Sequence, residues 1–156
     1  MITRKQTDEF SKVNIDGFVG DGHCFEAVLV RSLEPRVREA LNVVEYVNCI
    51  DTPLDRKGVD LRIVWVEGEK VGRLNIDFTK NCGWKALKVW DKRHFLERGT
   101  VFTQCILDAE LLKLYQNGSI NLRQLLRKGI ELWEEIRDLV EGGDLEAVQA
   151  YAEQHL

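Results

Sequence analysis

The sequence lacks any apolar run long enough to cross a bilayer. A membrane-spanning helix needs roughly 20 consecutive apolar residues, and no segment of the 156-residue chain approaches that length. The segment from Met1 to Asp8 is polar, and no apolar stretch follows it as a secretory leader would require. We therefore expect a cytoplasmic protein without a membrane partner.

Cysteine is sparse and widely spaced. Cys24, Cys49, Cys82 and Cys105 form no CxxC motif and no Cys/His pair, so the sequence offers no zinc knuckle. A disulfide framework would also be unusual without a secretion signal. We expect reduced, mostly buried thiols.

Motifs of several enzyme classes are missing. The chain has no Ser/His/Asp string, no Gly-rich phosphate loop and no dinucleotide fingerprint, which argues against nucleophile-elbow hydrolases, kinases and nicotinamide enzymes. Neither His23 nor His94 has a paired Cys, His or base in the sequence. A metal-binding or acid/base role is therefore not favoured for either histidine.

What is present is the composition of one globular domain over residues 1–156, with 44% apolar and 31% charged residues. The net charge of −4 gives no general attraction to nucleic acid. Its distribution is uneven, because eight acidic and only four basic residues follow Ser119. The segment from Lys80 to Arg98 instead has six basic residues against Asp91 and Glu97, and forms a local basic patch.

Hydrophobic periodicity predicts a mixed α/β fold. Phe25 to Leu33 has helical spacing behind a candidate cap at Asp21-Gly22, and Pro35 either ends this helix or opens a second short one. The remaining pattern predicts strands over 43–50, 59–66, 71–79 and 100–107, a hairpin through 67–70, and helices after Gly83, over 122–140 with Ser119 or Asn121 as cap, and from Asp144.

Two acidic residues stand out against this pattern. Asp60 lies near the start of the second strand, and Asp77 interrupts the third strand between Ile76 and Phe78, although Asp is disfavoured within strands. Carboxylates on neighbouring strands can converge on one Mg²⁺, which prefers oxygen ligands and keeps water on its remaining positions. Such a metal can polarise a phosphodiester and activate a bound water.

The helix with Glu26, the segment "DRKGVD", the hairpin and the strand "LNIDFTK" together resemble the αβββαβ core of the PD-(D/E)XK nuclease superfamily, also called the restriction-endonuclease-like fold. The resemblance covers about residues 21–107 and leaves 108–156 as a C-terminal helical extension. It implies that Asp60 and Asp77 bind Mg²⁺ or Mn²⁺ with help from Glu26.

The position of the family's catalytic lysine, two residues after the second acid, is occupied by Thr79. A neutral threonine cannot supply the positive charge that phosphoryl chemistry uses. Lys80 is adjacent, but strand alternation directs it to the opposite face. The alternatives are Lys85 or Lys88 on the following helix, and Lys57.

Three hypotheses follow. The first is a magnesium-dependent nuclease with Asp60, Asp77, Thr79, Lys80 and Lys85 at its site, which holds DNA through the basic patch. The second is an inactive descendant used as a binding or assembly module, with a homodimer formed through the C-terminal helices. The third is an unrelated α+β domain. Trp84 and Trp90 either stack on bases or, more commonly for such a stripe, belong to the core.

Overall fold

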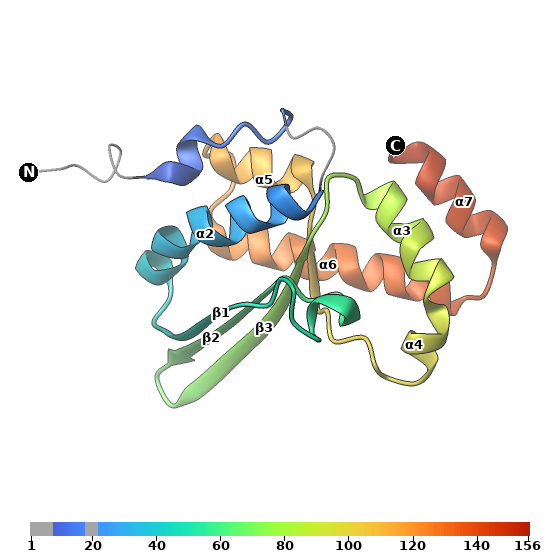
Figure 1. The fold of residues 1–156 in the computed structure, drawn as a ribbon, viewed down its shortest axis with the longest axis horizontal. Helices are drawn as coiled ribbons and strands as arrows, with labels where there is room; N and C mark the ends of the chain where they lie inside the picture. Colours follow the sequence, from blue (N-terminus) through green and yellow to red (C-terminus); the bar gives the residue numbers. More distant parts are fainter. Residues whose placement is uncertain (1–7, 18–21) are drawn as a thin grey trace, which may run out of the picture.

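The computed structural model describes residues 8–17 and 22–156, except for the side chains of 22–24. It has an α/β fold in which a four-stranded mixed sheet is packed against helices (Figure 1). The strands β1 (Val43–Asn48), β2 (Leu61–Glu67), β3 (Lys70–Phe78) and β4 (Cys105–Leu107) lie side by side in that order. The first three pair antiparallel, and β4 is parallel to β3.

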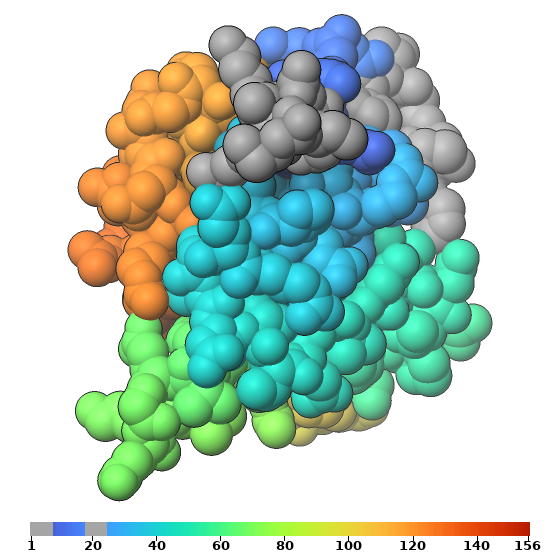
Figure 2. All heavy atoms as spheres, turned by 90° about the vertical axis from the view of Figure 1, so that its left-hand side faces the viewer, coloured from blue at the N-terminus to red at the C-terminus, as the bar shows by residue number. Residues whose placement is uncertain are grey.

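The predicted hairpin joins β2 to β3. Glu67 pairs with Lys70, which leaves Gly68 and Glu69 in a tight turn, and Gly68 has a φ of 61° that suits glycine. Leu61 pairs with Ile76 at the other end of the ladder. The tip of the hairpin projects from the body of the molecule (Figure 2).

The first long helix is α2 (Gly22–Ala40), and Pro35 lies inside it. The prediction that Pro35 ends this helix or opens a new one is therefore wrong. Proline removes one hydrogen bond and crowds the preceding turn, but Leu33 and Val37 are both buried on either side of it. Their packing on the sheet holds the helix together through the proline. The candidate cap at Asp21 lies outside the described residues.

Two helices, α3 (Cys82–Asp91) and α4 (Arg93–Glu97), connect β3 to β4. The predicted strand over 100–107 is wrong in length, because only Cys105–Leu107 forms a ladder. Residues 102 to 104 are held to the sheet differently. The Asn75 side chain donates to the Phe102 carbonyl at 2.9 Å, and the Asn75 amide donates to the Gln104 side chain at 3.0 Å.

The C-terminal helices are α5 (Ala109–Gln116), α6 (Leu122–Glu141) and α7 (Leu145–Gln154). Of the two predicted caps of α6, Asn121 is the one that forms it, in a capping box with Gln124, and Asp144 caps α7 as predicted. The apolar stripe of α6 is buried within the chain itself. Dimerisation through these helices stays a prediction, and the stripe that suggested it is already covered.

Two hydrophobic clusters form the core. One joins the sheet to α2, α5 and α6, together with Phe10 from the 3-10 helix η1 (Glu9–Lys12). The other joins α3, α6 and α7 around Trp133 and Ile136. α6 contributes to both clusters and therefore fixes α3 relative to the sheet. Among the described residues, no helix is both long and apolar enough to cross a membrane.

Candidate active site

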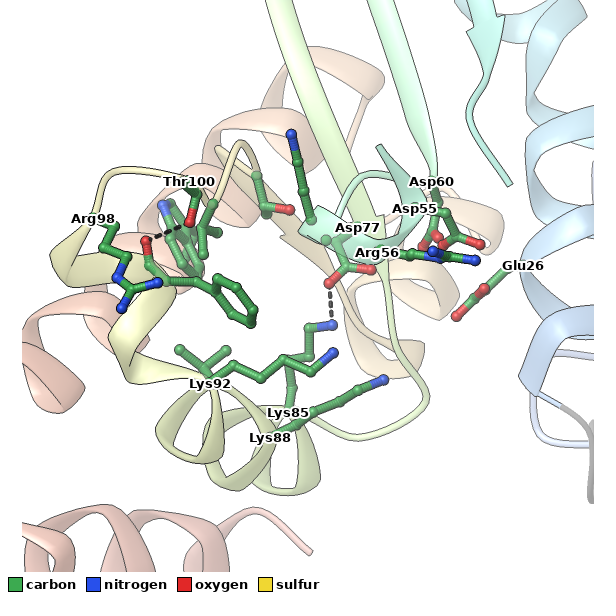
Figure 3. A pocket seen from close by; sticks show the side chains of 17 residues that line it. Glu26, Asp55, Arg56, Asp60, Asp77, Lys85, Lys88, Lys92, Arg98 and Thr100 are labelled. Carbon is green, nitrogen blue, oxygen red and sulfur yellow. Dashed lines mark hydrogen bonds and ion pairs between the residues drawn. The ribbon is translucent and has the colours of Figure 1, made fainter. Parts of the chain in front are cut away.

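A cavity of about 410 Å³ opens where α2, the end of β3 and α3 meet. The short 3-10 helix η2 (Asp55–Lys57), α4 and Trp133 of α6 complete its walls. Four carboxylates reach it from four different segments: Glu26, Asp55, Asp60 and Asp77. Figure 3 shows Glu26, Asp55 and Asp60 at one end, Arg98 and Thr100 at the other, and Asp77 with Lys85 between them.

Asp60 and Asp77 face each other across the paired strands. Asp60 directly precedes Leu61, whose partner is Ile76, and Asp77 directly follows Ile76. Both side chains are buried, with 2% and 4% of their surface exposed. The Phe78 amide donates to Asp60 Oδ2 at 2.8 Å, which fixes the orientation of this carboxyl. The predicted convergence of the two acids is therefore present.

Crowding of buried carboxyls changes their protonation. Burial and then the neighbouring Asp77 raise the pKa of Asp60 to about 10, although the hydrogen bond from Phe78 opposes this shift. Burial, followed by Asp77 and Asp55, raises the pKa of Glu26 to about 7. Asp60 and Glu26 are therefore harder to ionise than carboxyls exposed to water.

Asp55 is a site residue that the sequence did not reveal. One ligand oxygen each of Glu26, Asp55 and Asp60 lies within 4.8 Å of the other two. Asp55 begins η2 and also accepts a hydrogen bond from the Asp51 amide at 3.0 Å. The signal was present in "DRKGVD", which begins with Asp55, but a single turn of 3-10 helix has no periodicity that would predict its direction.

Lys85 supplies the positive charge of the site. Its Nζ forms an ion pair with Asp77 Oδ2, and both side chains are largely buried. Asn81 caps α3 by accepting from the Trp84 amide, so the helix begins immediately after β3. A helical side chain points back toward the N-terminus of its helix, which directs Lys85 onto the strand end. Burial lowers the pKa of Lys85, but Asp77, Asp60 and Glu26 outweigh burial and raise it.

Thr79 and Lys80 do not line the cavity. The Thr79 hydroxyl donates to the Asn81 carbonyl at 3.2 Å, within the turn that leads into α3. Lys80 places its Nζ 5.6 Å from the centre of the Phe25 ring, toward α2. Lys57 and Lys88 do line the cavity. Of the candidate lysines, Lys85 thus contacts Asp77, and Lys88 and Lys57 line the same cavity.

The basic patch divides into two groups. Lys85, Lys88, Lys92 and Arg98 line the cavity, whereas Arg93 lies 4.2 Å from the Trp90 ring outside it. Trp90 is half-buried against the second core cluster, as the more common interpretation of the stripe predicts. Trp84 differs from that interpretation, because 64% of its surface is exposed.

The donor set fits a hard divalent cation. All candidate ligands are carboxylate oxygens, which Mg²⁺ and Mn²⁺ prefer over nitrogen or sulfur. Asp60 is common to both possible ligand groups, since it faces Asp77 and also belongs to the cluster with Glu26 and Asp55. Burial and, after it, mutual repulsion raise the pKa values of Asp60 and Glu26, and a cation here would offset both effects.

Comparison with known proteins gave no match to this chain among family models, curated proteins or solved structures. The resemblance to the PD-(D/E)XK core therefore stays a prediction.

Proposed function

We propose that the protein is a metal-dependent nuclease that hydrolyses phosphodiester bonds of DNA. The observation that carries this proposal is the ion pair of Lys85 with Asp77 beside the cluster of Glu26, Asp55 and Asp60. A cluster of acids alone is common on protein surfaces. Four carboxylates with a buried lysine, inside a cavity bordered by further cations, form a set suited to phosphoryl chemistry.

Each residue has a distinct role in this proposal. Asp60 and Asp77 hold the cation, with Glu26 and Asp55 completing the carboxylate shell. A bound Mg²⁺ or Mn²⁺ would supply Lewis-acid polarisation of the phosphate and a water of lowered pKa. Lys85 is held on Asp77 and offsets negative charge that develops on the phosphoryl group. Lys85 therefore supplies the positive charge that the neutral Thr79 cannot supply.

The cations around the cavity position the DNA backbone. Lys88, Lys92 and Arg98 lie on the wall formed by α3 and the segment after it. Contacts of this kind bind phosphates without regard to sequence. The net charge of −4 does not oppose binding at this place, because the acidic excess lies in the C-terminal helices. A cytoplasmic location stays part of the proposal, supported by the free, buried thiols of Cys49, Cys82 and Cys105.

The test is cleavage of supercoiled and single-stranded circular DNA in the presence of Mg²⁺ or Mn²⁺. Asp77→Asn keeps the volume of the side chain and removes its charge, and is expected to abolish cleavage. Asp91→Asn is the matched control, because Asp91 is exposed on α3 and does not line the cavity. Cleavage that survives Asp77→Asn would refute the assignment. Metal binding without cleavage would favour the non-catalytic binding module.

A further inference from the structure

The cavity extends beyond the carboxylates into a part that hydrolysis alone does not require. This part is lined by Val89 of α3, Phe95 of α4, Trp133 of α6, and Val101 from the segment between α4 and β4. A phosphate and a hydrated metal need polar surroundings, whereas this wall is apolar and aromatic. Figure 3 shows the cavity continuing from Asp77 and Lys85 toward Arg98 and Thr100. The end of the cavity beside Phe95 therefore differs in its lining from the end with the carboxylates.

Phe95 is held as a fixed element of this wall. The Thr100 amide and hydroxyl both donate to the Phe95 carbonyl, at 2.9 and 3.0 Å, and close the turn after α4. The residue keeps 39% of its surface exposed, and the ring of His94 lies against its ring with 4.1 Å between the ring centres. An exposed aromatic ring on an anchored backbone is a suitable platform for stacking with another flat ring.

Two cations that line the cavity form no direct ion pair among the described residues. Lys85 and Lys88 of α3 and Lys92, the residue directly after α3, follow one another at spacings of three and then four residues, where like charges repel. Lys85 is paired with Asp77, but no ion pair of Lys88 or Lys92 occurs among the described residues. Burial, followed by Lys88 and Lys85, lowers the pKa of Lys92. A bound anion would relieve this repulsion.

Thr103 adds an unmet hydrogen bond. It lines the cavity, only 5% of its surface is exposed, and its Oγ1 has no hydrogen-bond partner among the described residues. Buried hydroxyls are normally satisfied by protein, water or ligand. An aromatic ring, cations without an ion pair and a polar group together complement the base, the phosphate and the sugar of a nucleotide. The cavity volume of about 410 Å³ also lies within the roughly 300–1,000 Å³ that small-molecule sites occupy.

We propose that the cavity receives an unpaired nucleotide, with its base against Phe95 and Trp133 and its phosphate beside Lys88 and Lys92. A base stacked within a duplex cannot enter a cavity of this shape and must first leave the helix. The inference rests on the proposed nuclease function and narrows it, because the substrate is then single-stranded or extruded DNA rather than continuous duplex.

Binding without hydrolysis tests this inference. Fluorescence anisotropy in EDTA compares three labelled 12-mers: single-stranded DNA, a fully abasic strand of the same length, and the duplex. The wild-type protein is expected to bind the intact single strand most tightly. Phe95→Ala is expected to weaken that binding by about 5-fold or more, the value of one stacked base, and to leave binding of a fully abasic strand unchanged.

Controls separate base contacts from phosphate contacts. Trp84→Ala removes an exposed aromatic ring on α3 that does not line the cavity, and should have no effect. Phe95→Tyr should retain base-dependent binding, which excludes misfolding as the cause. Lys88→Ala should weaken intact and abasic strands equally. Tightest binding of the duplex, no binding of single strands, or equal loss with Phe95→Ala and Trp84→Ala would overturn the inference.

Because the experiment contains no divalent metal, its failure is distinguishable from failure of the nuclease proposal. Loss of base-dependent binding with Asp77-dependent cleavage intact would remove only the nucleotide pocket. Base-dependent binding without metal-dependent cleavage would leave a nucleotide-binding cavity that is not catalytic.

Discussion

The ion pair between Lys85 and Asp77 joins the start of α3 to the end of β3 inside the cavity. The cation beside the carboxylates therefore comes from α3 and not from position 79, which follows β3 and is occupied by a threonine. Asp77 also faces Asp60 across the sheet. One residue thus links the proposed metal ligands to the proposed stabiliser of phosphoryl charge.

Lys85→Met should separate metal binding from hydrolysis. We expect Mg²⁺-dependent cleavage to fall by about 100-fold or more, in line with the loss of one preorganised electrostatic contact. Metal affinity should be retained or increased, because Asp77 loses the cation that competes with Mg²⁺. Cleavage kinetics and calorimetric titration of the same preparation measure the two effects.

The control for Lys85→Met is Lys80→Met, which changes a lysine near the same turn that does not line the cavity. Lys80→Met should leave cleavage within a few-fold of the wild type. Equal losses from both substitutions would mean that Lys85 has no special role. Since removal of one partner of a buried pair costs about 3–5 kcal/mol, thermal unfolding must show that the variant is folded at the assay temperature.

Metal binding should depend on Asp60. Calorimetric titration with Mg²⁺ and Mn²⁺ is expected to show binding by the wild type and none by Asp60→Asn. Saturating metal should also raise the melting temperature of the wild type, because a ligand that binds only the folded state stabilises it by about 2.7 kcal/mol at 100 times its Kd. An unchanged melting temperature with both metals would contradict a carboxylate metal site, and Asp91→Asn should behave as the wild type.

Local patterns predicted the parts of the fold that depend on one segment at a time. Alternation in β3 placed Asp77 on the polar face, and the polar residues before α6 offered Ser119 or Asn121 as its cap, of which Asn121 is correct. The hairpin followed from the turn around Gly68. These features are set by neighbours within a few residues, so a single sequence contains them.

Tertiary packing determined the features that the sequence left open. The sequence left Lys85, Lys88 and Lys57 open, and only the packing of α3, held by α6, brings Lys85 onto Asp77. Asp55 reaches the cluster from η2, a single turn between β1 and β2 that no periodicity indicates. Continuation of α2 through Pro35 likewise reflects burial of Leu33 and Val37 rather than local preference.

Stability of the metal-free protein should fall as the pH rises. Burial and Asp77 raise the pKa of Asp60 from its ordinary value of 3.8 to about 10 in the folded state. Folding therefore binds a proton between about pH 4 and pH 10, and the unfolding free energy decreases across this window. Glu26 acts in the same direction between 4.5 and about 7.

Asp60→Asn should reduce this pH dependence, because an amide stays neutral in both states. Urea unfolding at pH 5, 7 and 9 in EDTA measures it, and the wild type should lose more stability over this range than the variant. Saturating Mg²⁺ should flatten the wild-type curve, since the metal replaces the proton. Parallel curves for wild type and variant would show that Asp60 does not carry the raised pKa.

Gly129→Ala should destabilise the fold at the contact between α6 and β4. A Cβ at Gly129 of α6 would lie 2.4 Å from Cys105 Sγ and 2.6 Å from a methyl carbon of Leu107, both in β4. Overpacking of this kind costs about 1–3 kcal/mol, more than the gain in helix propensity of roughly 1 kcal/mol. Urea unfolding should therefore show a net loss of stability.

Gly142→Ala is the matched control at the end of the same helix. Gly142 has a helical φ of −62°, and the nearest atoms to an added Cβ are 3.4 and 3.5 Å away. Its unfolding free energy should stay within about 0.5 kcal/mol of the wild type or rise slightly. Because α6 also holds α3, Gly129→Ala should lower cleavage as well, by shifting Lys85 away from Asp77. A destabilised but fully active Gly129→Ala protein would show that α6 packing does not position the site.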